Sequence, residues 1–163
     1  MQPLCPKGGN DKVYTPSTLS SLIVNHFNPS GKIVEPCRGK GSFSSLMPGC
    51  DWFEIDDGKD FLLAEGHWDW AVTNPPWSQF RPFLKKSMEV ADNVVFLALL
   101  NAWFMKARMR DMKEAEFGIA EILLVDTPSK PWPQTGFQLA DVHIKRGYRG
   151  DIKLTEGKLA KAA

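Results

Sequence analysis

Short apolar runs along the chain alternate with longer stretches in which apolar residues recur every three or four positions. The run at 94–100 is continuous, which is typical of a strand that is buried on both faces of a sheet, and 119–125 is predicted to be another buried strand. The repeating stretches have the period of an α-helix with one buried face. The pattern predicts helices over 16–27, 80–91 and 102–116, and further strands over 32–35, 51–56, 69–73 and 137–145.

This alternation of strands and helices is typical of an α/β fold with a mostly parallel sheet. Asp57, Gly58 and Lys59 alone separate Asp56 from Asp60, which is too short for a parallel crossover. The third strand is therefore expected to be shortened or vestigial, unless the Asp60 segment is merely an edge loop. Because only the proline-rich loop joins the last two strands, one antiparallel strand is expected near that edge.

The first predicted helix has a start signal, with Thr15 as the expected N-cap and Pro16 at the first helical position. We expect one catalytic domain over 14–147, preceded by an N-terminal loop over 1–13 and followed by a basic tail over 148–163. The tail is interpreted as a solvated terminus, and contact with phosphates is the alternative.

Composition argues against several classes of protein. The 163 residues carry a net charge of +1, and they contain neither an apolar run of membrane-spanning length nor an N-terminal signal segment. A cytoplasmic protein without a membrane partner is therefore expected. Three cysteines and three histidines are widely scattered, so no metal site and no disulfide framework is predicted.

The tetrapeptide Asn74-Pro75-Pro76-Trp77 directly follows the strand expected over 69–73. Two consecutive prolines remove two backbone donors and force the chain into a stiff, extended loop. On this loop the Asn74 amide and the Pro75 carbonyl provide two acceptors, and Trp77 provides a flat face. A planar polar group would fit there. The alternative is a strand-ending turn with a packed tryptophan.

A second motif follows the strand over 32–35, which ends in the carboxylate of Glu35 and leads into a loop with Gly39 and Gly41. Such a strand, glycine loop and helix hold nucleotide-like ligands in α/β sheets, because glycine lets the backbone approach the ligand closely. Glu54 and Asp56 end the next strand, at a position that suits a ribose diol. Two solvated acids on a loop are the alternative.

Taken in order, these motifs resemble the class I S-adenosylmethionine-dependent amino-methyltransferases, above all the adenine-N6 DNA methyltransferases. The resemblance covers nearly all of the chain from 14 to 147. The matching segments are Thr15-Pro16, Glu35 to Phe43 with Pro36, Gly39 and Gly41, Glu54-Ile55-Asp56, Asp60-Phe61 and Asn74-Pro75-Pro76-Trp77. It implies a Rossmann-like class I methyltransferase fold and S-adenosyl-L-methionine as the cofactor.

The resemblance also implies roles for the residues that hold this cofactor. Glu35 would bind the methionine ammonium, with Thr15 nearby, and Glu54 would bind the ribose hydroxyls. Ile55 and Phe61 would sandwich the adenine ring, and Asp60 would accept a hydrogen bond from its amino group. The full expected cofactor set is Thr15, Glu35, Pro36, Gly39, Gly41, Phe43, Glu54, Ile55, Asp56, Asp60 and Phe61.

The expected acceptor is an adenine flipped out of DNA. Asn74 and Pro75 would each accept one hydrogen of its amino group, which draws the nitrogen toward tetrahedral geometry and aims its lone pair at the methyl group. Trp77 would stack on the base. Trp132 or Phe137 would cover the other face, and the alternative is that both are core residues under the last loop.

One feature of the family has no counterpart in this sequence, because nothing in it resembles a target-recognition domain. A separate specificity subunit or a homodimer is therefore an expected partner. Two other functions stay open: a protein-glutamine or RNA methyltransferase with the same core, and a cofactor-binding module without transferase activity.

Overall fold

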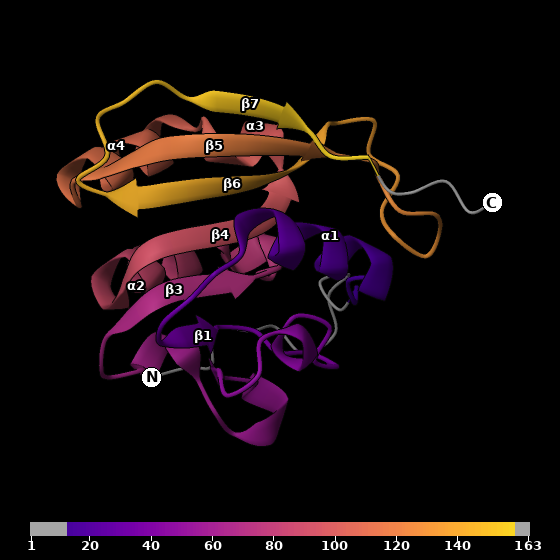
Figure 1. Ribbon diagram of the computed structural model, residues 1–163, viewed down its shortest axis with the longest axis horizontal. Helices are drawn as coiled ribbons and strands as arrows, with labels where there is room; N and C mark the ends of the chain where they lie inside the picture. Colours follow the sequence, from indigo (N-terminus) through magenta and orange to yellow (C-terminus); the bar gives the residue numbers. More distant parts are fainter. Residues whose placement is uncertain (1–12, 159–163) are drawn as a thin grey trace.

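A sheet runs through the centre of the structure, a computed structural model that describes residues 13–158 (Figure 1). Its strands are β1 (Ile33–Glu35), β2 (Asp51–Trp52), β3 (Trp68–Thr73), β4 (Ala91–Leu99), β5 (Phe117–Val125), β6 (Leu139–Arg146) and β7 (Lys153–Glu156). The α-helices are α1 (Ser17–Phe27), α2 (Phe80–Val90), α3 (Leu100–Trp103) and α4 (Lys106–Glu114). Within the described residues the strand order is β2-β1-β3-β4-β6-β5-β7.

The sheet combines parallel and antiparallel pairing. β2, β1, β3 and β4 pair in parallel, β6 runs antiparallel between β4 and β5, and β7 pairs in parallel with β5. The predicted α/β class, with its mostly parallel sheet and an antiparallel strand near one edge, is confirmed. The antiparallel strand arises because the loop after β5 reverses the chain without a crossover helix.

The prediction of a vestigial third strand is also confirmed. Between β2 and β3 the chain forms two short 3₁₀ helices, η2 (Ile55–Asp57) and η3 (Phe61–Leu63), and an isolated bridge between Glu54 and Lys59. Gly58 ends η2 in the left-handed conformation and turns the chain back at once. β2 therefore forms the edge of the sheet on this side.

Helices cover both faces of the sheet (Figure 1). One buried cluster joins α1 to Val95 and Leu97 of β4, and a second joins α2 and Trp103 to Val94 and Phe96 of the same strand. Successive residues of a strand point to opposite faces, so a strand covered on both sides must be apolar at every position. This packing explains the continuous apolar run that identified β4 in the sequence.

The single helix expected over 102–116 is wrong, because the structure contains α3 and α4 in its place. Met105 has an extended backbone with a ψ of 137° and separates the two helices. The guanidinium of Arg108 donates a hydrogen bond to the carbonyl of Ala102 and holds the turn. The sequence contains no glycine or proline at this break, so its apolar spacing reads as one helix.

The segment after β6 contains a strand that the sequence pattern did not predict. β7 lies along β5 inside the expected basic tail, and the Thr155 hydroxyl donates to the Glu121 carboxylate at 2.6 Å. The final strand of the sheet is thus β7 and not β6. The expected N-terminal loop falls at 1–13 and, except for residue 13, lies outside the described residues.

Candidate active site

The carboxyl ends of β1 and β3 carry the two main sequence motifs, and these strands are hydrogen-bonded neighbours. β1 ends at Glu35, and β3 ends at Thr73, immediately before Asn74. Because the carboxyl ends of parallel strands meet at one edge, the two loops leave the sheet side by side. The Thr73 hydroxyl donates to the Cys37 carbonyl at 3.1 Å and ties the loops together.

The Asn74 amide is oriented by one hydrogen bond and open for another. Its Nδ2 donates to Thr15 Oγ1 at 3.2 Å, which directs the carbonyl side of the amide away from this bond. The Oδ1 atom is buried and has no hydrogen-bond partner within the part of the chain that the structure describes. This corner thus offers one acceptor, the Asn74 Oδ1 atom, without a partner among the described residues.

The expectation that Thr15 caps α1 is wrong. α1 begins at Ser17 after Pro16, and no side chain makes a capping hydrogen bond there. Thr15 is buried and instead connects three segments: its hydroxyl accepts from Asn74, and its carbonyl accepts from Ser42 Oγ at 2.7 Å. The first helix, the glycine loop and the Asn74 corner thus meet at one residue.

The three aromatic residues expected around an acceptor differ in exposure. Trp77 is half-buried, its Nε1 donates to the Leu97 carbonyl at 3.3 Å, and its ring meets Trp132 edge-on at 5.9 Å between centroids. Trp132 is 3% exposed and belongs to the core on the α1 side, as one alternative held. Phe137 is 58% exposed and contributes no buried surface to that core.

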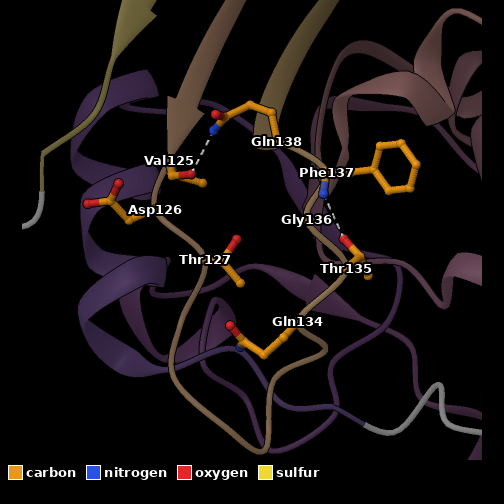
Figure 2. A pocket seen from close by; sticks show the side chains of 8 residues that line it. All are labelled: Val125, Asp126, Thr127, Gln134, Thr135, Gly136, Phe137 and Gln138. Atoms are coloured by element: carbon orange, nitrogen blue, oxygen red, sulfur yellow. Dashed lines mark hydrogen bonds between the residues drawn. The ribbon is translucent and has the colours of Figure 1, made fainter.

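A cavity of about 380 Å³ lies between the two arms of the loop that joins β5 to β6 (Figure 2). Asp126 and Thr127 line the cavity from one arm, and Gln134 and Thr135 line it from the other. The Phe137 ring projects away from the space between the arms. No residue of the predicted cofactor motifs lines this cavity. Phe137, one of the aromatic residues predicted around the acceptor, does line it.

Glu35 is a buried carboxyl group near the glycine loop, only 1% exposed. Its Oε2 accepts a hydrogen bond from the backbone N–H of Ser44 at 2.7 Å. Burial raises the pKa of Glu35 to about 8, because the charged form is poorly solvated there and the Ser44 hydrogen bond only partly compensates. A ligand cation next to Glu35 would stabilise the carboxylate, so the site fits the ammonium group predicted for it.

The glycine loop is held by the second predicted acid. Glu54 Oε2 accepts from the Gly39 N–H at 2.7 Å, and Oε1 accepts from the Asp56 N–H at 3.2 Å. Each carboxylate oxygen keeps a further lone-pair direction, so Glu54 can still accept from ribose hydroxyls. Gly39 has a φ of +53°, and a Cβ atom there would lie 3.1 Å from the Tyr14 ring, so the loop favours glycine at this position.

The remaining predicted cofactor residues are divided between the surface and the core. Ile55 is 45% exposed and Asp56 is exposed at the start of η2, while Asp60 Oδ1 accepts from the Leu62 N–H at the start of η3. Phe61 is 1% exposed and packs against Phe53 and Phe83, so its ring offers no open face to an adenine. The other members lie in or beside the loop, with Pro36, Gly41 and Phe43 buried.

Sequence reasoning missed the residues that hold the motifs in place. Ser42, Ser44 and Thr73 connect the loops by hydrogen bonds, and Arg38 stacks on Trp52 with its guanidinium carbon 4.4 Å from the ring centroid. Serine and threonine are common in loops, so their spacing carries no signal. The adjacent cation and aromatic ring at the edge strand are likewise invisible until the fold brings them together.

Two further properties follow from residues 13–158. This part of the chain contains no group of three histidine, cysteine, aspartate or glutamate residues that could hold a metal ion. It also contains no helix that is long and apolar enough to cross a membrane.

Comparison with known proteins identifies the fold. No protein-family model and no curated protein sequence matches the chain. Among solved structures, a candidate class I S-adenosylmethionine-dependent methyltransferase from Listeria monocytogenes aligns with a TM-score of 0.66 and 11% identity, covering 94% of this chain and 68% of that one.

Two other solved structures have the same architecture. A modification subunit of a candidate type I restriction enzyme from Vibrio vulnificus aligns with a TM-score of 0.61 and 14% identity, over 96% of this chain and 49% of its own. Magnesium protoporphyrin IX methyltransferase from Synechocystis PCC 6803, with bound S-adenosylmethionine, aligns with a TM-score of 0.52 and 11% identity, over 80% and 76%. The chain therefore has the Rossmann-like fold of class I S-adenosylmethionine-dependent methyltransferases.

Proposed function

We propose that the protein transfers a methyl group from S-adenosylmethionine to a planar exocyclic amine, and that this amine is adenine N6 in DNA. The observation that carries the proposal is the Asn74 Oδ1 atom, which is buried, oriented by Thr15 and unpaired among the described residues. An unpaired buried acceptor costs about 1–3 kcal/mol of stability, which a substrate N–H would offset. The modification subunits of type I restriction enzymes among the structures with this fold favour DNA as the acceptor.

The residues at the Asn74 corner would act on the acceptor. Asn74 Oδ1 and the Pro75 carbonyl each accept one hydrogen of the amino group, so the nitrogen moves toward tetrahedral geometry and its lone pair is less delocalised into the ring. The same two oxygens stabilise the positive charge that grows on the nitrogen as it is methylated. The proton then leaves to solvent, and no strong base is required. Trp77 supports the base with its ring.

The residues at the end of β1 would act on the cofactor. Bound S-adenosylmethionine supplies a methyl group that is already activated by the sulfonium. Glu35 holds the ammonium end, Glu54 holds the ribose hydroxyls, and the exposed Ile55 covers one face of the adenine, with Asp60 accepting from its amino group. Because Gly39 and Gly41 carry no side chains, the backbone of this loop leaves room for the methionine part of the cofactor.

Recognition of the DNA would involve a second chain, either a specificity subunit or a second copy of this chain. The chain spans about half the length of the restriction-enzyme modification subunits with which it aligns, at 49% and 45% of their chains.

The proposal is tested by incubating the protein with S-adenosylmethionine labelled in the methyl group and, separately, with duplex DNA, RNA and glutamine-containing peptides. We expect label in DNA, recovered as N6-methyladenine by mass spectrometry after digestion. Label in RNA or on glutamine and not in DNA would show that adenine in DNA is not the acceptor. Cofactor binding by calorimetry without transfer to any of the three would indicate a binding module and contradict the transferase function.

Gly39→Ala is expected to weaken S-adenosylmethionine binding at least about tenfold, equivalent to about 1.4 kcal/mol. The added methyl group would lie 3.1 Å from the Tyr14 ring, so the ring or the loop must shift by a few tenths of an ångström, and the φ of +53° is unfavourable for alanine. Calorimetric titration of the folded variant measures the affinity.

Gly49→Ala is the matched control for this substitution. Gly49 has a φ of +78°, but a methyl group added there would have nothing within 4 Å, so alanine adds backbone strain without a contact. Both variants should lose about 1 kcal/mol of stability from strain, and only Gly39→Ala should lose affinity. If the two variants bound S-adenosylmethionine with equal affinity, the cofactor would not lie close to the backbone at Gly39.

A further inference from the structure

Exposed apolar side chains gather where α3 meets α4. Phe104, Met105 and Met109 are 46%, 56% and 40% exposed within six positions of the chain. Large exposed apolar side chains close together mark binding surfaces more often than isolated ones do. Lys106 and Arg110 are exposed between and beside them on the outer side of α4. We call these five residues the α4 patch.

The charge around the α4 patch is positive although the whole chain is nearly neutral. The helix α4 itself contains four lysines and arginines against two acids, Asp111 and Glu114, whereas the net charge of the chain is +1. The buried Asp111 carboxylate accepts hydrogen bonds from Arg81 Nε and Nη2 at 2.6 and 3.0 Å. Its charge is therefore paired with Arg81 and does not neutralise the cations on the outer side of α4. Arg110 meets Glu114 only at 4.0 Å, with both side chains mostly exposed, which makes a weak pair.

The start of α4 is poorly arranged for the stability of the helix alone. Lys106 is its first residue, its first turn contains no acid, and no side chain caps it. Cations at a helix N-terminus oppose the helix dipole. A local feature that disfavours folding is expected at functional surfaces, and a bound polyanion would offset the repulsion here.

The helices that carry the α4 patch are connected through one aromatic ring to the segment that follows the Asn74 corner. Phe80 begins α2 directly after the short helix η4 (Trp77–Gln79) that follows the two prolines. The Trp103 ring of α3 meets Phe80 at 5.0 Å between centroids, and the Arg108 guanidinium of α4 lies 4.7 Å from the Phe80 centroid. The turn between α3 and α4, which carries Phe104 and Met105, is therefore held against the residue that follows η4.

We propose that the α4 patch binds the nucleic acid strand next to the base that enters the Asn74 corner. Lys106 and Arg110 contact phosphates, and Phe104, Met105 and Met109 pack against exposed base or sugar surfaces. This inference names the docking surface for the proposed function and rests on it for its biological meaning. Binding can nevertheless be measured without cofactor and without transfer, so the two can fail separately.

The test is fluorescence anisotropy of a labelled DNA duplex containing one unpaired adenine, titrated with the full chain between about 50 and 200 mM salt, the range in which counterion release is strong. The variant Lys106→Ala/Arg110→Ala should weaken binding about tenfold at low salt and reduce the slope of log K against log salt by about 2. Phe104→Ala should weaken binding and leave that slope unchanged.

The matched control is Lys145→Ala/Arg149→Ala. Lys145 pairs with Asn93 near the start of β4, whereas the patch follows the other end of this strand. The control should bind DNA as the wild type does. All the substituted side chains are exposed, and unchanged melting curves confirm folding.

Three results would overturn the proposal that the α4 patch binds DNA: no DNA binding by the wild type, wild-type affinity in the patch variant, or loss of binding in the control alone. Wild-type affinity in the patch variant would indicate that this surface binds another protein and not DNA. If the patch variant loses affinity as expected and no acceptor is methylated, the patch stands and the proposed transferase function fails.

Discussion

Asn74→Ala should lower methyl transfer about 10²–10³-fold while the affinity for S-adenosylmethionine stays within about twofold of the wild type. The reason is that Asn74 Oδ1 acts on the acceptor amine and not on the cofactor. Alanine removes the acceptor and leaves the amino group with the Pro75 carbonyl alone. Initial rates with saturating cofactor give the loss in transfer, and calorimetry gives the affinity.

Two further variants separate this role from a structural one. In Asn74→Asp an acceptor oxygen remains, and the Thr15 hydroxyl can turn to donate to it, so part of the activity should be retained. Asn25→Ala, at an exposed position of α1, should be fully active. Wild-type rates in Asn74→Ala would show that this amide does not take part in transfer.

The affinity for S-adenosylmethionine is expected to rise about tenfold per pH unit between about pH 6 and 7.5. The pKa of Glu35 is about 8 in the ligand-free protein, so the carboxyl is mostly protonated in this range. Binding of the ligand ammonium favours the carboxylate and lowers that pKa, so a proton is released on binding. Raising the pH removes this proton in advance and strengthens binding. Titration calorimetry in buffers of different ionisation enthalpy measures the proton released.

Glu35→Gln should bind more weakly at about pH 7.5 and lose this dependence on pH, because glutamine does not titrate. Glu54→Gln should also bind more weakly, but it should keep the dependence, since Glu35 is intact. An affinity for the wild type that is constant or falls as the pH rises would rule out Glu35 as the residue that pairs with the ammonium.

The sequence could predict those parts of the site that depend on one local segment. The strand that ends in Glu35, the glycine loop and the corner at Asn74 each have a pattern set by backbone sterics, and parallel pairing of β1 with β3 brings them together. The missing third strand followed from the length of one short connection. Each of these patterns is local, and only their arrangement side by side depends on the pairing of β1 with β3.

What the sequence could not predict depends on residues that meet only in the folded chain. The bond from Asn74 to Thr15 joins positions 59 residues apart, and a Thr-Pro pair before a helix looks like a cap whatever its tertiary contacts. Phe61 looks like a ligand-binding aromatic until Phe53 and Phe83 enclose it. The break between α3 and α4 likewise depends on Arg108 reaching back to Ala102.

The most direct test of the proposed site is a crystal structure of the protein with S-adenosylhomocysteine. We expect the ligand across the carboxyl ends of β1 and β3, with its amino group on Glu35, its ribose hydroxyls on Glu54 and its sulfur facing the Asn74 corner. A ligand that occupied the cavity between the arms of the loop from β5 to β6, or a crystal that took up none at saturating concentration, would contradict it.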